Sequence, residues 1–141
     1  TYMGPLGSGY AAKLINNLIV GGEITLIAEA FGLARRAGVD LTRLMEALSG
    51  GAAASPVLTM KGSKMISGDY TASSRVLIHL KDQHNAQEMA RALGADIPAC
   101  DLSTLLLEKL ADMGRGNEDV AAVIDLFQSK VDLRRLWNGN L

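Results

Sequence analysis

Apolar residues recur along most of the chain at helical spacing, and no stretch alternates apolar and polar residues as a strand would. The pattern predicts six helical segments, separated by breaks rich in glycine, serine or proline. They cover about 8–37, 42–48, 55–65, 74–93, 98–113 and 118–129. We therefore expect an all-α fold over residues 1–129, a helical bundle around one long central helix, followed by a polar tail at 130–141.

Residues with capping chemistry mark several of the expected helix ends. Ser8, Thr42 and Ser55 are candidate N-caps because a side-chain hydroxyl can accept a hydrogen bond from a free amide of the first turn. Gly38 and Gly94 can adopt the left-handed backbone conformation with which many helices end. The breaks and the periodicity therefore agree on where the helices begin and end.

The first predicted helix is too long for one small domain to cover. Thirty residues at 1.5 Å per residue span about 45 Å, whereas a domain of 141 residues has a radius of gyration near roughly 14 Å. Its apolar residues also cover most of its circumference, so a second copy of the chain or a second domain must bury the remainder. We expect a homodimer or tetramer formed through this helix.

The same helix has to be considered as a possible membrane span, since residues 14–33 are mostly apolar and long enough to cross a bilayer. It contains Asn16, Asn17, Glu23 and Glu29. A carboxylate near the centre of a bilayer costs roughly 2.5 kcal/mol or more. The sequence therefore favours a buried helix and no membrane partner.

Charge and cysteine content indicate which partners and which cellular compartment to expect. The chain carries 14 basic and 15 acidic residues with no basic stripe, so nucleic acid is not an expected partner. The single cysteine, Cys100, excludes an internal disulfide and favours a reducing compartment such as the cytoplasm. Cys100 itself is either a small buried side chain or a reactive thiol. The start at Thr1 suggests a piece of a longer protein.

The first candidate site lies at the beginning of the long helix, in the run GPLGSGYAAKLINN from Gly4 to Asn17. The backbone at Ser8 and Gly9 enters a helix whose first amides could receive an anion such as a carboxylate. Lys13 and Asn17 are four residues apart and share one helical face. Apolar neighbours would desolvate Lys13 and lower its pKa, which suits proton transfer.

A structural interpretation of this run remains open on spacing alone. Lys13 could simply extend its charged end into solvent from an amphipathic helix. The run is not a dinucleotide fingerprint, because it lacks the third glycine and follows no predicted strand, and it is not a P-loop, because neither Ser nor Thr follows the lysine.

The second candidate is the pair Lys81-Asp82 in the fourth predicted helix. Adjacent charges on a helix usually face solvent, so the pair is weak by itself. His79 and His84 are five residues apart, off the spacing that places two histidines on one face for a metal ion, and we expect no metal site.

These motifs, in this order, resemble those of the β-hydroxyacid dehydrogenase family. That family includes 3-hydroxyisobutyrate dehydrogenase and 2-hydroxy-3-oxopropionate reductase and is related to 6-phosphogluconate dehydrogenase. The resemblance implies that Lys13 is the catalytic acid/base and that Asn17 holds substrate oxygens. It places the backbone of Ser8 and Gly9 beside the substrate and assigns Lys81 to the cofactor, NAD or NADP. Asn16 matches a frequent asparagine with no clear role.

Two turns extend the resemblance to about residues 3–127: the small-residue turn 49–55 and the Gly-x-Gly-x-x-Asp turn 114–119. At Gln83, His84 and Asn85 the family more often has leucine or small apolar residues. The resemblance therefore does not predict how these three side chains pack. The helix stop and cap in 114–119 would also occur without any catalytic role.

The family implies reversible hydride transfer between a small 3-hydroxy acid and NAD or NADP. The glycine fingerprint for the cofactor would belong to an amino-terminal Rossmann domain that this chain lacks. We therefore expect the chain alone to be inactive as a dehydrogenase. The alternative is a non-catalytic dimerisation module that keeps the motif only as scaffold.

Overall fold

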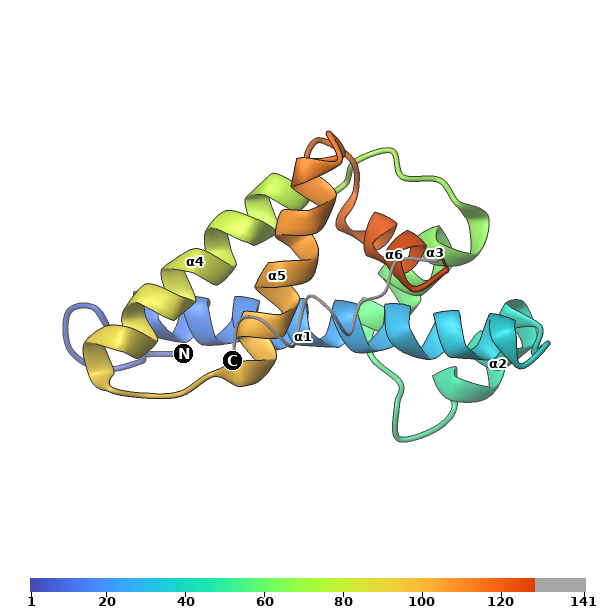
Figure 1. Cartoon of the computed structure of the whole chain (residues 1–141). Helices are drawn as coiled ribbons and strands as arrows, with labels where there is room; N and C mark the ends of the chain where they lie inside the picture. Colours follow the sequence, from blue (N-terminus) through green and yellow to red (C-terminus); the bar gives the residue numbers. More distant parts are fainter. Residues whose placement is uncertain (129–141) are drawn as a thin grey trace.

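One helix, α1 (Ser8–Arg36), runs through the length of the molecule, and most of the other helices pack against it (Figure 1). The structure is a computed structural model that describes residues 1–128. Within this range there is no β-strand, only an isolated bridge between Arg75 and Asp119. The prediction of an all-α bundle around one long central helix is confirmed.

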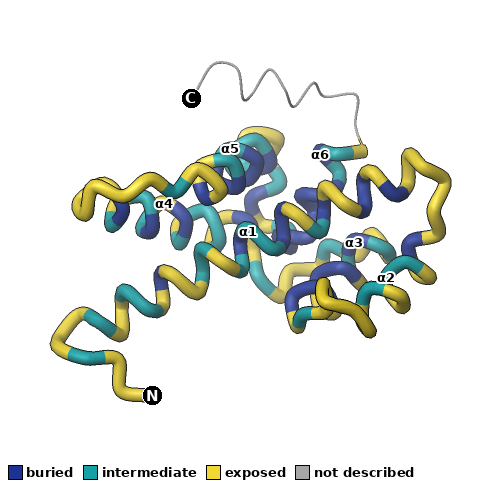
Figure 2. Tube along the Cα trace, turned by 90° about the horizontal axis from the view of Figure 1, so that it is seen from below, coloured by how far each residue is buried: buried dark blue, intermediate teal, exposed yellow. Residues whose placement is uncertain are grey.

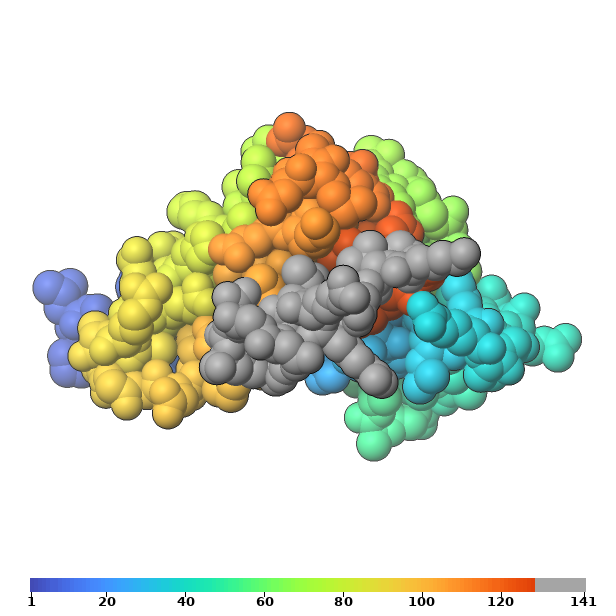
Figure 3. All heavy atoms as spheres, in the orientation of Figure 1, coloured from blue at the N-terminus to red at the C-terminus, as the bar shows by residue number. Residues whose placement is uncertain are grey.

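The remaining helices divide over the two halves of α1. Helices α4 (Val76–Leu93) and α5 (Pro98–Asp112) lie side by side over its amino-terminal part and middle (Figure 1). Helices α3 (Ser63–Ser67) and α6 (Ile124–Gln128) lie toward its other end, where α2 (Leu41–Ser49) also packs. In the space-filling view the surfaces of α4 and α5 adjoin, and the amino-terminal residues, in blue, lie at the left edge beyond them (Figure 3).

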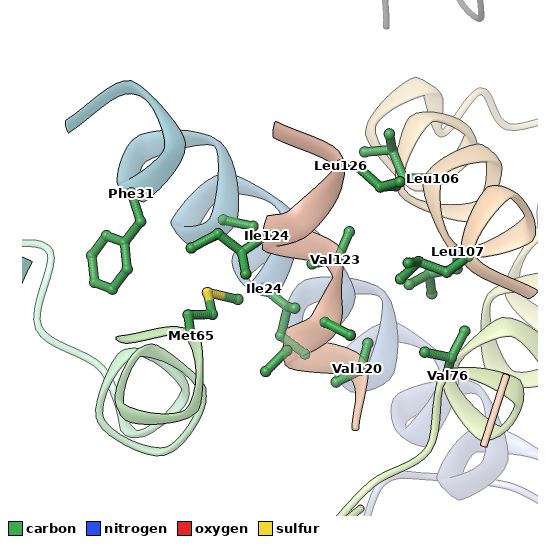
Figure 4. Packing of buried hydrophobic residues seen from close by; sticks show 14 of the residues in the cluster. Ile24, Phe31, Met65, Val76, Leu106, Leu107, Val120, Val123, Ile124 and Leu126 are labelled. Carbon is green, nitrogen blue, oxygen red and sulfur yellow. The ribbon is translucent and has the colours of Figure 1, made fainter. Parts of the chain in front are cut away.

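The hydrophobic core fills the space between α1 and the short helices that cross it (Figure 4). Helix α1 contributes Ile24 and Phe31, and α3 contributes Met65, all 1% exposed or less. The 3₁₀ helix η2 (Val120–Val123) is buried at every position. Because η2 and α6 bring consecutive apolar residues into contact with both α1 and α5, this segment closes the core.

The observed helix ends agree with several of the predicted signals. Helix α1 ends at Arg36 with Gly38 at φ 74°, and α4 ends at Gly94 with φ 65°. Ser55 acts as a cap, because its Oγ accepts a hydrogen bond of 2.9 Å from the Leu58 amide. These left-handed glycines and the serine cap are local features that the sequence predicts without reference to packing.

Two predicted caps are wrong. Gly7, at φ 95°, is the residue before α1, and Ser8 is already helical with its amide bonded to the Pro5 carbonyl at 3.1 Å. The cap of α2 is Asp40 rather than Thr42, since the Asp40 carboxylate accepts the Arg43 amide at 2.8 Å. In both cases the cap precedes the hydroxyl residue: Gly7 lies one residue before Ser8, and Asp40 lies two residues before Thr42.

The third and sixth predicted helices contain geometry that the pattern did not predict. The third includes a π-helical turn, η1 (Leu58–Gly62), before α3 continues to Ser67. The sixth begins as the 3₁₀ helix η2, with Asp119 as its N-cap. Ser129, the predicted end of that helix, and the predicted tail 130–141 lie outside the described residues.

The π turn carries a buried ion pair that ties distant parts of the chain together. Lys61 Nζ lies 2.9 Å from Asp119 Oδ1, and the two side chains are 8% and 0% exposed. Asp119 Oδ2 also accepts the amides of Ser73 and Ser74 at 2.9 and 3.1 Å. The carboxylate therefore joins η1, the 71–75 loop and the start of η2.

Exposed residues recur along most of the length of α1 (Figure 2). An exposed stripe consists of Ile15, Ile19, Leu26 and Leu33, which are 51%, 58%, 66% and 69% exposed. Their spacing of four, seven and seven residues keeps them on one helical face. By length and composition α1 could span a membrane, with a mean hydropathy of 1.4 in its most apolar window, of which 39% is buried. Its buried face forms the core of the domain, which favours the packed-helix interpretation.

Candidate active site

Lys13 and Asn17 lie one turn apart on the same face of α1, near the end that projects from the domain. Lys13 is exposed and makes no hydrogen bond or ion pair with any residue in the described range. The apolar residues beside it in sequence therefore do not shield it, contrary to the expectation that they would desolvate its amine. A second surface would have to cover Lys13 to remove it from water.

Asn17 is the residue that connects α1 with the Lys81-Asp82 pair. Its Nδ2 donates a hydrogen bond of 3.0 Å to Asp82 Oδ2, across 65 residues of sequence. Both side chains are half-buried. The structure thus brings the two sequence motifs together on adjacent helices, and Asp82 is a functional candidate to which the sequence assigned no role of its own.

Lys81 lies next to Asp82 but is exposed, and among the described residues it has no hydrogen-bonding or ionic partner. Ser8 and Gly9 lie in the first turn of α1, at the projecting end beyond Lys13. The predicted site residues therefore lie on α1 and α4, and in the described part of the chain only Asn17 and Asp82 are in mutual contact. We call Ser8, Gly9, Lys13, Asn17, Lys81 and Asp82 together the strip.

A buried polar cluster lies beneath this strip, at the junction of α1, α4 and α5. Gln83 is 2% exposed, and its Nε2 donates to Ser103 Oγ at 3.3 Å while its Oε1 accepts from the Cys100 thiol at 2.6 Å. Ser103 in turn donates to the Gly21 carbonyl at 3.3 Å and accepts from Thr25 at 3.0 Å. Gln83, which departs from the family pattern, is therefore a packing residue whose polar atoms all have partners.

Gly21 makes this close packing possible. A Cβ atom built at Gly21 would lie 1.8 Å from Gln83 Nε2, far inside van der Waals contact. Cys100 is 1% exposed, and burial raises the pKa of its thiol. The structure therefore supports the interpretation of Cys100 as a small buried side chain and not as a reactive thiol.

His79 and His84 have separate surroundings. His79 Nε2 lies 2.8 Å from Ser74 Oγ, and burial, followed by the charge of Lys61, lowers its pKa. His84 pairs with Glu108 at 3.1 Å on the surface. Across residues 1–128 no group of three His, Cys, Asp or Glu side chains is placed to hold a metal ion.

An open groove of about 580 Å³ lies away from this strip, between α2 and α3. Its walls carry the side chains of Met45, Glu46 and Ile66 together with several hydroxyl groups. None of the predicted site residues contributes to it. The strip that contains Lys13, Asn17 and Lys81 is therefore the stronger candidate for chemistry.

An amine, an amide and a second amine on two packed helices are groups that can bind a small oxygen-containing anion. Such a strip can transfer a proton and hold substrate oxygens, but by itself it cannot exclude water. The described residues also contain no strand and no glycine fingerprint to hold a dinucleotide. The fold and the site together define an all-helical domain that carries an exposed amine beside an amide but, among the described residues, no dinucleotide-binding fold.

Comparison with known proteins agrees with this class. Residues 7–127 match the family described as "NAD-binding of NADP-dependent 3-hydroxyisobutyrate dehydrogenase", and the chain belongs to this family. A curated relative is the 2-hydroxy-3-oxopropionate reductase of Escherichia coli K12, with 30% identity over 91% of this chain and 44% of the relative. The L-threonate dehydrogenase of the same strain is 32% identical over 86% of this chain and 40% of its own length.

A solved structure agrees with the fold. The crystal structure of 3-hydroxyisobutyrate dehydrogenase from Salmonella typhimurium superimposes with a TM-score of 0.82 at 32% identity, covering 85% of this chain and 42% of that one. The chain thus spans less than half the length of these three relatives.

Proposed function

We propose that this chain is the carboxy-terminal helical domain of an NAD- or NADP-dependent dehydrogenase that interconverts a small 3-hydroxy acid and its oxo acid. The observation that carries the proposal is the contact between Asn17 and Asp82, at 3.0 Å, because it joins the helix of Lys13 to the helix of Lys81. Both lysines are exposed and without a partner among residues 1–128, so both are available to a ligand. The family and its dehydrogenase relatives support the same class.

In this function Lys13 is the acid/base. During oxidation its neutral amine accepts the proton of the substrate hydroxyl, and the nicotinamide, when bound, would take up the hydride from the same carbon. During reduction the protonated amine returns the proton to the oxygen. Asn17 orients that oxygen, and the backbone at Ser8 and Gly9, in the first turn of α1, lies beside the substrate carboxylate. General acid/base groups of this kind typically contribute about 10²- to 10⁴-fold in rate.

The nicotinamide cofactor supplies the hydride acceptor, and a nucleotide-binding domain of the kind implied by the family would hold most of it. Within this chain Lys81 is the residue we assign to it, because the family resemblance points to it and the residue is exposed on α4 next to Asp82. We propose the cytoplasm as the compartment, in keeping with a single buried cysteine. The 141-residue chain alone should show no dehydrogenase activity, because its half of the site remains open to water.

The decisive experiment replaces Lys13 in the protein that combines this chain with its nucleotide-binding domain. Lys13→Ala should lower kcat by about 10²-fold or more and leave cofactor binding nearly unchanged. Lys13→Arg should be almost as impaired, because arginine keeps the charge but does not give up its proton. Lys109→Ala, on α5, is the matched control and should retain normal turnover. A near-normal kcat in both Lys13 variants would remove the acid/base role.

A second role, dimerisation, is supported by the exposed stripe on α1. Four large apolar side chains that are each more than half exposed are costly to leave in water, and a second copy presenting the same face would bury them. We propose a homodimer or tetramer through this stripe. It is compatible with catalysis, and it would be the whole function of the chain if the Lys13 variants were fully active.

A further inference from the structure

We propose that Asp82 is a positioning residue, which fixes the Asn17 amide so that its carbonyl oxygen, and not its amino group, faces the substrate hydroxyl. This inference rests on the proposed function. It begins from an ambiguity of asparagine: the two ends of the amide have nearly the same shape, and a rotation of 180° exchanges an acceptor for a donor. Only the neighbours of the side chain can decide which end faces a ligand.

The hydrogen bond to Asp82 makes that decision. An ionised carboxylate can only accept hydrogen bonds, so the atom of Asn17 that approaches Asp82 Oδ2 at 3.0 Å has to be the nitrogen. The flipped amide would place two oxygens against each other and lose a charge-assisted bond. Asp82 therefore strongly favours one orientation.

The same contact turns Asn17 Oδ1 away from α4. Its neighbour there is Asn16, whose Nδ2 donates at 3.3 Å in an exposed position, a longer bond to a group that water can replace. Oδ1 is thus free to accept a hydrogen bond from an incoming alcohol. The chemical consequence is a preference for a hydroxyl donor at this position, which is the reduced form of the substrate carbon that also faces Lys13.

The position of Asp82 is itself held by the residue that follows it. Gln83 is 2% exposed and bonded to both Ser103 and Cys100, and it lies against Gly21, one turn beyond Asn17 on α1. Helices α1 and α4 therefore cannot slide past each other at this point without a steric clash. The carboxylate meets the amide from a fixed backbone position, as a positioning residue must.

The test uses the complete enzyme with Asp82→Asn, which has the same shape but offers both a donor and an acceptor. The amide of Asn17 would then be free to flip, and kcat/KM for the hydroxy acid should fall roughly 10- to 100-fold, the range for a lost bond to a charged group. Asp82→Glu keeps the carboxylate and should recover part of this loss. Glu88→Gln removes the same charge from an exposed position on α4 and should leave kcat/KM unchanged.

A second variant separates positioning from a general structural effect. In an Asn17→Ala background, Asp82→Asn should cause no further loss, since the residue through which Asp82 acts is gone. The inference is overturned if the two losses multiply, or if Asp82→Asn behaves like Glu88→Gln. Melting temperatures of all variants should agree to within a few degrees, because the contact is half-buried; a collapse of the fold in Asp82→Asn would also contradict a purely positioning role.

A readout that needs no turnover keeps this inference distinct from the proposed function. In ¹H–¹⁵N spectra of the 141-residue chain, Asp82→Asn should shift the side-chain amide signals of Asn17, whereas Glu88→Gln should leave them in place. Inactive wild-type enzyme, or fully active Lys13→Ala, would defeat the proposed function even with this shift present. Active wild-type enzyme without the shift would defeat the positioning role alone.

Discussion

Removal of the Asp119 carboxylate should be among the most damaging single changes to the stability of this domain. The carboxylate is fully buried and accepts hydrogen bonds from the Lys61 ammonium group, the Ser73 and Ser74 amides, the Ser73 hydroxyl and the Ala121 amide. Asp119→Ala leaves all these donors without their acceptor and leaves the lysine charge buried and unpaired. Breaking a buried pair in this way typically costs about 3–5 kcal/mol.

That cost can be measured directly by urea unfolding followed by circular dichroism. For a chain of this size roughly 3 °C of melting temperature is lost per kcal/mol, so Asp119→Ala should melt roughly 10–15 °C below the wild type. Asp96→Ala is the matched control, because Asp96 is exposed in the turn between α4 and α5. A loss below about 1 kcal/mol, or one equal to that of the control, would refute the reasoning.

The same carboxylate should make stability depend on acid. Burial alone would raise the pKa of Asp119, but the hydrogen bonds from Lys61 and Ser73 outweigh it and hold the pKa well below its ordinary value. A group whose pKa is depressed by folding stabilises the folded state fully above its unfolded pKa, about 3.9, and less as the pH falls further. The difference in unfolding free energy between wild type and Asp119→Ala should therefore shrink progressively below about pH 4 and stay constant above pH 6.

Two further changes probe the long helix. Gly21→Ala should destabilise the chain by about 1–3 kcal/mol, because its Cβ would displace the Gln83 amide. Gly22→Ala is the control, since a Cβ there would have no atom within 4 Å. It should cost no stability when measured at concentrations where the chain is monomeric. Equal effects of the two would contradict the close packing of α1 on α4. Leu26→Lys should shift sedimentation from dimer to monomer. Leu93→Lys, at a leucine that is 73% exposed against 66% for Leu26 but lies off the stripe, should not. Unchanged sedimentation of Leu26→Lys would place the interface elsewhere.

The helices could be predicted from the sequence because their signals are local. The apolar period of α1, the glycines after α1 and α4, and the Ser55 cap each act within a few residues. The π turn at Lys61 could not be predicted in this way, since the feature associated with it is an ion pair with a residue 58 positions later. The sequence predicts Asp119 only as the start of a helix, and nothing in the neighbouring residues indicates that its side chain pairs with buried Lys61.

The candidate site likewise has features that the sequence predicts and features that depend on how the helices pack. Lys13 and Asn17 are found by their spacing and by family resemblance, and both lie on one face as expected. The contact of Asn17 with Asp82 depends on how α4 crosses α1, which a helical pattern does not specify. The desolvation of Lys13 failed as a prediction because sequence neighbours on a helix point in different directions and do not surround one another.

The close packing of α1 on α4 at Gly21 also determines how Asn17 and Asp82 are placed relative to each other. Gly21 lies one turn from Asn17 on α1, while the residue that it meets on α4 is the neighbour of Asp82. A side chain at position 21 would push the helices apart where the amide and the carboxylate have to meet. Under the function proposed above, a substitution of Gly21 would therefore lower turnover as well as the stability of the fold.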